Sequence, residues 1–303
     1  MKVGNEDIRA KLPQGPTGIA IGTFDGVHLG HQLVVKTLLN LCAEKKLHPV
    51  VITFRKHPLT VIRPDHAPGM LSDNETRIKR LESLGVKVIM LDFTPELRSM
   101  DVEHWFAILK HDFDARLVVV GYDNTFGCDG REKSFNDYRE IGKKYGLEII
   151  KAPVKENISS TRIRDAVSAG DVEAANKMLG YPFEIKSSVC HGREIGRKLG
   201  FPTANLKIDP ALILPAPGVY SADACTDTGD IYRAVVNIGR APTFSDSLPM
   251  TIEAHLIGFK GDLYGKIMKL NFIRRLRGEK KFKDPEALKI AIGQDIEQAQ
   301  QNI

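Results

Sequence analysis

Short apolar runs alternate with longer segments of helical periodicity through the first half of the chain. Between the runs, apolar residues recur every three or four positions, as they do on one face of an α-helix. Strands separated by helices predict an α/β domain built on a doubly wound parallel sheet. The five expected strands are residues 18–21, 49–54, 86–91, 117–120 and 147–150.

Residues of the capping type mark the starts of three of these helices. Ser72 begins a capping-box pattern ahead of one helix, which Gly85 ends. Asp101 and Ser134 are the expected caps of two more. Trp105, the only tryptophan, falls on the inward face of the second of these helices, so we expect it in the core rather than against a ligand.

The second half of the chain has a different period. After Tyr181 and Pro182, the helical spacing gives way to the two-residue alternation of strands. The close spacing of these strands predicts a small closed antiparallel β-barrel, and the apolar positions from 288 to 296 predict a terminal helix packed against it. We therefore expect two domains, residues 1–182 and 183–303. The expected barrel strands are residues 184–190, 218–224, 232–237, 251–257 and 267–272.

The composition is that of a globular protein, with 303 residues of which 42% are apolar and 27% charged. No apolar run approaches the ~20 residues of a membrane span, and the first residues lack the apolar core of a secretion signal. We expect a cytoplasmic protein with no membrane partner. The net charge of +5 comes from dispersed basic residues, so anionic small substrates explain it as well as nucleic acid does. The four cysteines lack any Cys-x-x-Cys spacing, which indicates neither a disulfide framework nor a zinc site.

Ten residues between the first strand and the first helix carry the clearest chemical signal. They read Gly22-Thr-Phe-Asp-Gly-Val-His-Leu-Gly-His31. A glycine-rich turn that opens a helix offers backbone N–H groups and a positive dipole end, which suits a phosphate. His28 and His31 can donate hydrogen bonds to the charge that builds on a phosphoryl group under attack. The pattern predicts a nucleotide site with further contacts from Gly22, Phe24, Asp25 and Gly30.

This spacing is neither the Gly-x-Gly-x-x-Gly of dinucleotide-binding folds nor a Walker loop, since no Gly-Lys-Ser/Thr follows it. Two alternatives remain for the histidines. They could be structural residues beside a turn, or they could be metal ligands, although no further His or Cys stands at a suitable spacing.

Three more segments follow strands of the expected parallel sheet, where the ligands of such sheets bind. They are residues 57–58, 121–127 and 158–164. The last segment places hydroxyl, backbone and guanidinium donors at a helix start, which suits a triphosphate tail. The alternative is an ordinary N-cap followed by two solvated arginines. The donor residues are Ser160, Thr161, Arg162 and Arg164.

A second glycine-rich string lies in the expected barrel domain, with basic residues between Gly192, Gly196 and Gly200. Such a string can wrap phosphates. Thr203 and Asn205 stand two apart on an extended segment, so they point the same way and offer oxygen ligands for Mg²⁺. The alternative is an ordinary loop that is rich in turns.

Phosphoryl transfer to a hydroxyl also needs a carboxylate that orients or deprotonates it. Glu253 is the candidate, because Ile252 and Ala254 share one face of the expected strand and leave Glu253 and His255 on the other. The alternative is a solvated glutamate on a strand.

The chain resembles the bifunctional riboflavin kinase/FAD synthetase family of bacteria over nearly its full length. His28-Leu29-Gly30-His31 is similar to the His-x-Gly-His signature of the nucleotidyltransferase superfamily. The resemblance implies a Rossmann-like N-terminal domain that joins FMN to AMP and a C-terminal β-barrel domain that makes FMN from riboflavin. The matching strings are residues 22–31, Ile158-Ser-Ser-Thr-Arg-Ile-Arg164, Leu199-Gly-Phe-Pro-Thr-Ala-Asn-Leu206, Asn237-Ile-Gly-Arg-Ala-Pro-Thr-Phe244 and Asp262-Leu-Tyr-Gly265.

For the adenylyltransferase domain, the resemblance implies that His28 and His31 stabilise the α-phosphate of ATP while the FMN phosphate attacks it. It places Asp123 in the cleft for flavin and nucleotide. It assigns the β- and γ-phosphates to Ser160, Thr161, Arg162 and Arg164.

For the kinase domain, the resemblance implies Thr203 and Asn205 at Mg²⁺ and phosphate, and Glu253 as the base for the 5′-hydroxyl of riboflavin. It makes a phosphate flap of Gly192, Gly196 and Gly200. The expected ligands are ATP, riboflavin and FMN, with FAD as the final product and Mg²⁺ as the cofactor. We expect a monomer or a weak homo-oligomer with no nucleic-acid partner.

Two departures from the family pattern leave alternatives open. Asn124 stands where the family usually has an aromatic residue, and Ser187-Ser188-Val189 replaces the more usual Gly-x-Val. The leading hypothesis is an enzyme with both activities. The first departure supports the alternative that only one activity is effective, because one flavin pocket has drifted. A flavin-binding regulator that acts on nucleic acid is a third hypothesis.

Overall fold

The computed structural model describes residues 9–121, 127–192, 196, 199–240 and 250–301. The chain forms two compact units, Met1–Ile158 and Ser159–Ile303. This division falls earlier than the domain boundary expected from the change of period, because the two helices after Ile158 pack with the barrel. The division into two units does not by itself assign a reaction to either unit.

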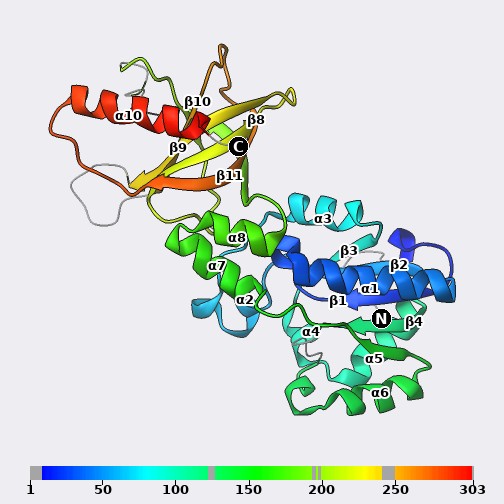
Figure 1. Cartoon of the computed structure of the whole chain (residues 1–303). Helices are drawn as coiled ribbons and strands as arrows, with labels where there is room; N and C mark the ends of the chain where they lie inside the picture. Colours follow the sequence, from blue (N-terminus) through cyan, green and yellow to red (C-terminus); the bar gives the residue numbers. More distant parts are fainter. Residues whose placement is uncertain (1–8, 122–126, 193–195, 197–198, 241–249, 302–303) are drawn as a thin grey trace. The chain divides into compact units, whose positions relative to one another are not determined.

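The first unit is built on a five-stranded parallel sheet, as expected, and its strand order is β3-β2-β1-β4-β5 (Figure 1). Since β1 lies between β2 and β4, the chain runs outward from β1 in one direction and later in the other. The observed strands agree with the five expected ones to within two residues at each end. They are β1 (Thr17–Ile21), β2 (His48–Phe54), β3 (Lys87–Leu91), β4 (Ala115–Val120) and β5 (Glu148–Lys151).

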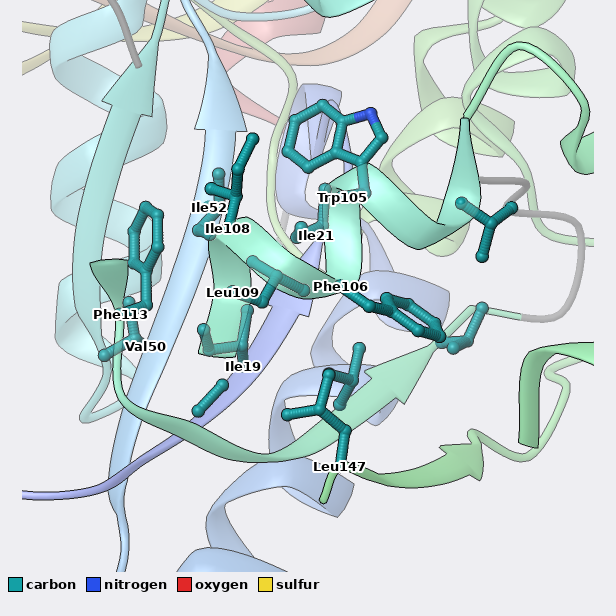
Figure 2. Close-up of a cluster of buried hydrophobic side chains, with 14 of the residues drawn as sticks. Ile19, Ile21, Val50, Ile52, Trp105, Phe106, Ile108, Leu109, Phe113 and Leu147 are labelled. Atoms are coloured by element: carbon teal, nitrogen blue, oxygen red, sulfur yellow. The ribbon is translucent and has the colours of Figure 1, made fainter. Parts of the chain in front are cut away.

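Helices cover both faces of this sheet, because successive strand residues point to opposite sides. Ile19 and Ile21 of β1 pack in a cluster with α5 (Val102–Asp112) and α6 (Phe135–Lys144). Ala20 packs in a second cluster with α1 (Leu29–Lys45) and α3 (Asn74–Ser83). Figure 2 shows the first cluster, in which Trp105 is buried as predicted. The helices are α1 (Leu29–Lys45), α2 (Leu59–Ile62), α3 (Asn74–Ser83), α4 (Pro95–Ser99), α5 (Val102–Asp112) and α6 (Phe135–Lys144), with 3₁₀ turns at Arg9–Lys11, Asp25–Val27, Pro64–His66 and Gly130–Glu132.

Two of the three predicted helix caps are confirmed, and one is wrong. Asp101 accepts a hydrogen bond from the N–H of His104, and Ser134 heads a capping box at the start of α6. At α3, however, the cap is Asp73 rather than Ser72, since the Asp73 carboxylate accepts the N–H of Thr76 at 2.8 Å. Serine and aspartate are both good N-cap residues. The position at which the helical backbone begins decides that Asp73 is the cap.

The second unit contains a closed antiparallel barrel in the strand order β10-β7-β6-β11-β8-β9. All five expected strands are present. The sixth, β7, was expected only as an extended segment, because three residues are too few to show an alternation. The strands are β6 (Glu184–Cys190), β7 (Ala204–Leu206), β8 (Gly218–Cys225), β9 (Ile231–Arg240), β10 (Met250–Leu256) and β11 (Ile267–Arg277).

The barrel is filled by the inward residues of its strands, and the terminal helix α10 (Pro285–Gln300) packs against the outside. Ala299 of α10 lies against Val219 and Val235 on the outer face of β8 and β9. The guanidinium of Arg277 donates to both carboxylate oxygens of the buried Asp295, at 2.8–3.2 Å. This bidentate ion pair links α10 to β11.

The helices α7 (Ser160–Ala169) and α8 (Val172–Leu179) also pack on the barrel. The Asn176 side chain donates to the carbonyl of Phe272 at 2.9 Å and accepts the N–H of Phe183 at 2.6 Å. The N–H of Ala216 donates to the carbonyl of Val167 at 3.2 Å. These bonds place the helical pair with the second compact unit.

Candidate active sites

The glycine-rich turn leaves the carboxyl end of β1 at the position where the strand order reverses, which is where open α/β sheets bind ligands. Phe24, Gly26 and Val27 all have positive φ, at 48°, 74° and 38°. A β-branched residue such as valine rarely adopts this conformation, and strain of this kind is concentrated at functional loops. The strained backbone of this turn therefore points to a functional role for it.

The two histidines of the motif lie against each other. Their rings stack with centroids 3.6 Å apart and planes inclined by 16°. His28 is the N-cap of α1, where its Nδ1 accepts the N–H of His31 at 3.3 Å. An ideal Cβ on Gly30 would lie only 3.1 Å from the His28 ring, so glycine leaves the room that this ring occupies.

The capping bond decides what His28 offers chemically. Since Nδ1 accepts this hydrogen bond, Nε2 is the ring nitrogen that can donate one. A donor of this kind stands beside the N-terminus of the 17-residue helix α1, whose dipole end is positive. The arrangement suits an anionic phosphate oxygen.

The other predicted residues of this motif form the base of the turn. The N–H of Gly22 donates to Ile52 of β2 at 3.1 Å, and Phe24 is buried against the core that contains Val27. Asp25 is 1% exposed, and its two carboxylate oxygens accept the N–H of Leu71 at 2.9 and 3.0 Å. Contacts of these residues with a nucleotide stay a prediction.

Asp123 and Asn124 lie outside the described residues. Near the start of β1, the side chain of Cys42 from α1 fills the space beside Gly18, and burial raises the pKa of its thiol to about 11. This neutral thiol is part of the core.

The predicted triphosphate donors stand on the first turns of α7. Ser159 caps this helix by accepting the N–H of Arg162 at 3.3 Å. Ser160, Thr161 and Arg162 lie on the partly or fully exposed first turn, and Arg164 is buried. Hydroxyl groups and the N-terminus of a ten-residue helix thus share one end of α7.

In the barrel, strand register brings the predicted carboxylate next to the predicted metal ligand. Glu253 of β10 pairs with Asn205 of β7 on one side and with Asn237 of β9 on the other. Since Ile252 and Ala254 point into the barrel, as predicted, these three polar side chains share its outer face. Asn237 was not among the predicted site residues, and only the pairing of β9 with β10 reveals its position.

Two glycines of the second string lie close to the two predicted oxygen ligands. An ideal Cβ on Gly192 would overlap the amide of Asn205, and one on Gly196 would lie 3.2 Å from Cγ2 of Thr203. Gly200 has a φ of 89°, which favours glycine. Gly192 therefore leaves space for the side chain of Asn205, and Gly196 leaves space chiefly for the carbonyl of Phe201 and also for the Thr203 side chain.

A cavity of about 500 Å³ adjoins Thr203. Its apolar lining includes Leu256 and Phe259, and Asp262 adds a carboxylate. Tyr264 also lines it and stacks on His191 with centroids 3.9 Å apart. The lining draws on two of the strings singled out in the sequence, residues 199–206 and 262–265, but neither string by itself indicated a cavity.

A parallel sheet with a stacked histidine pair at its switch point, followed by a barrel with paired asparagine and glutamate residues, defines a two-domain transferase of nucleotidyl and phosphoryl groups. A sequence model of the FAD synthetase family matches residues 11–165, and one of the riboflavin kinase family matches residues 179–303. The chain belongs to the bifunctional riboflavin kinase/FMN adenylyltransferase family.

Relatives carrying that family name cover most of the chain. The one from Bacillus subtilis is 35% identical, with 95% of this chain and 93% of its own length covered. The one from Escherichia coli K12 is 30% identical, with 94% and 92% covered. A crystal structure named as a macrolide-efflux protein from Streptococcus pneumoniae is 30% identical, covers 97% of each chain and has a TM-score of 0.88. Among the helices that the structure describes here, none has the length and apolar character needed to cross a membrane.

Proposed function

We propose that this chain makes FAD in two steps, first transferring the γ-phosphoryl group of ATP to riboflavin and then the AMP group of a second ATP to FMN. The observation that carries the proposal is the presence in one chain of both the stacked His28–His31 pair and the Asn205–Glu253 pair. The alternative of a single effective activity is not favoured, because both family models match and the relatives are named for both activities.

In the kinase step, Glu253 accepts the proton of the 5′-hydroxyl of riboflavin. The resulting oxygen nucleophile attacks the γ-phosphorus of ATP, the bond to the bridging oxygen breaks, and ADP leaves. The register that pairs Glu253 with Asn205 supports this role, because it sets a carboxylate beside the proposed phosphate position. The cavity next to Thr203 has the size and apolar lining that suit a planar ring of one of the two substrates.

Mg²⁺ suits the residues present in this half. Among the described residues, no group of three or more His, Cys, Asp or Glu side chains could hold a metal ion by itself. Mg²⁺ often binds through few protein ligands together with substrate phosphates, and the hydroxyl of Thr203 and the amide oxygen of Asn205 would complete such a set. Bound there, the ion would neutralise charge on the phosphates.

In the adenylyl step, a phosphate oxygen of FMN attacks the α-phosphorus of ATP, and pyrophosphate leaves. His28 and His31 donate hydrogen bonds to the α-phosphate and stabilise the charge that builds on it under attack. Ser160, Thr161, Arg162 and Arg164 bind the β- and γ-phosphate oxygens, and Asp123 is assigned to the flavin and nucleotide from the family resemblance alone. The capped N-terminus of α7 supports the assignment of the β- and γ-phosphates to residues of this helix. Neither step requires a covalent enzyme intermediate.

We further propose that the adenylyl and kinase chemistry divide at residues 182/183. The chain acts in the cytoplasm as a monomer or weak homo-oligomer, with neither nucleic acid nor a membrane as partner. The four cysteines support a reducing compartment, since all are free.

A pair of variants tests the proposal. The purified chain is incubated with ATP, Mg²⁺ and either riboflavin or FMN, and the flavins are separated by chromatography. His28→Ala should abolish formation of FAD from FMN and leave formation of FMN from riboflavin nearly intact, whereas Glu253→Gln should do the reverse. A folded wild-type chain that forms neither product refutes the function. Loss of both activities in either variant refutes the independence of the two sites.

A further inference from the structure

One buried cation in the first unit plays no part in the chemistry described so far. Arg77 of α3 is 0% exposed, although the same helix carries lysine and glutamate side chains on its exposed face. Its guanidinium donates to the carbonyl of Thr23 at 3.0 Å, to the carbonyl of Phe54 at 2.6 Å and to the side-chain oxygen of Asn74 at 2.5 Å. The bonds therefore join α3 to the residues that follow β1 and to the end of β2.

The Thr23 carbonyl lies near the start of the turn that carries the histidines. It accepts a second hydrogen bond from the hydroxyl of Thr53, at 2.8 Å. Two residues further on, the carboxylate of Asp25 accepts the N–H of Leu71, which lies just ahead of α3. The segment from Leu71 to Arg77 thus holds the turn on both sides of Phe24, whose φ is positive.

Packing alone does not explain an arginine at this position. Burying a guanidinium is costly, and an apolar side chain of similar volume would usually fill the same space at lower cost. Burial lowers the pKa of Arg77, and the carboxylates of Asp25 and Asp73 oppose that shift. The planar guanidinium of arginine can donate hydrogen bonds to several carbonyls at once, whereas methionine has no such donors.

A turn with three residues at positive φ keeps its shape only where the surroundings hold it. We propose that Arg77 is a positioning residue for adenylyl transfer: through the Thr23 carbonyl it holds the turn that carries His28 and His31 in the reactive geometry. Arg77 itself touches no substrate. The inference rests on the proposed adenylyl transfer at these histidines.

The test compares Arg77→Met with Arg77→Lys and with Lys79→Met, a control two residues away on the exposed face of the same helix. Trp105 is the only tryptophan and is buried in the first unit, so its emission reports whether that unit is folded. FMN formation from riboflavin by the same samples serves as an internal reference.

Arg77→Met should lower kcat for FAD formation at least about tenfold with KM for ATP little changed, since a small displacement of reacting groups costs up to about 10²-fold. Native Trp105 emission and FMN formation should persist. Arg77→Lys, which keeps the charge and some donors, should recover part of the loss, and Lys79→Met should match the wild type. A merely structural role would instead lower FAD formation in proportion to the native Trp105 signal.

Thr53→Val gives an independent test if Arg77→Met fails to fold. It removes the second donor to the Thr23 carbonyl with little change of shape, and it should lower kcat by a smaller factor than Arg77→Met. The inference is overturned if folded Arg77→Met keeps wild-type kcat, if its loss follows the Trp105 signal, or if Thr53→Val has no effect on kcat. A wild-type chain that forms no FAD refutes the proposed function instead.

Discussion

Replacing Gly192 by alanine tests the kinase site without removing any of its functional groups. Gly192 is not one of the glycines with a positive φ, so the φ angle does not exclude alanine at this position. The new methyl group would, however, overlap the side chain of Asn205, the proposed ligand of Mg²⁺. The change is therefore a steric displacement of one amide.

The size of that displacement follows from the structure. An ideal Cβ would lie 2.6 Å from Oδ1 of Asn205 and closer still to its Nδ2, whereas ordinary contact begins at 3.4 Å. The amide has to move by about 1 Å, and a misplacement of that size costs about 10²-fold in rate. We expect riboflavin phosphorylation to fall by about this factor, which corresponds to about 2.7 kcal/mol of activation free energy.

The assay measures FMN formed from riboflavin and FAD formed from FMN in the same preparation. FAD formation should stay within about twofold of the wild type, because the histidine turn is in the first unit. Gly293→Ala is the matched control. This glycine lies inside α10 with open space at its Cβ position, so alanine should leave both activities unchanged and stabilise the helix by about 0.5–1 kcal/mol.

The reasoning fails if folded Gly192→Ala phosphorylates riboflavin at the wild-type rate. In that case the position of the Asn205 amide would not matter to phosphoryl transfer. It fails equally if Gly293→Ala shows the same loss, because the effect would then not depend on contact with Asn205.

Four further outcomes are expected. Excess chelator should stop both reactions and added Mg²⁺ should restore them; full turnover in chelator would contradict the metal role given to Thr203 and Asn205. At pH 8, iodoacetamide should label the exposed Cys128 and Cys190 but not Cys42, whose buried thiol has its pKa raised to about 11, and mass spectrometry would locate the adducts. Between about pH 9 and pH 11, the Cys42 thiol is deprotonated in the unfolded chain but still protonated in the folded unit. The free energy of unfolding of this unit should therefore fall as the pH rises from 9 to 11. Asp73→Ala should destabilise the first unit by about 1 kcal/mol in denaturant titrations followed by Trp105 emission. Ser72→Ala should be nearly neutral there, since the buried hydroxyl of Ser72 has no hydrogen-bond partner among the described residues, and equal effects of the two variants would contradict the assignment of the cap.

Local pattern was sufficient for most of the fold. The apolar runs of the first half predicted the parallel strands because a strand buried on both faces needs apolar residues at consecutive positions. The period of two after Pro182 predicted the barrel because its strands alternate between core and outer face. The histidine turn was recognisable because a strand, a glycine-rich turn and a helix start are contiguous in the chain.

Contacts between distant segments were beyond that pattern. Ser72 and Asp73 are equally good cap residues on paper, and β7 is too short to show a period. Nothing in the run from Ser72 to Ser83 distinguishes Arg77 from a solvated arginine.

The sequence by itself determined the order of the elements, the histidine motif and the family, because each depends on neighbouring residues. Only the tertiary structure decided that Glu253 stands between Asn205 and Asn237, and that Arg77 binds the carbonyls of Thr23 and Phe54. Strand register and burial depend on how segments far apart in the chain pack together, and no local pattern of residues encodes that packing.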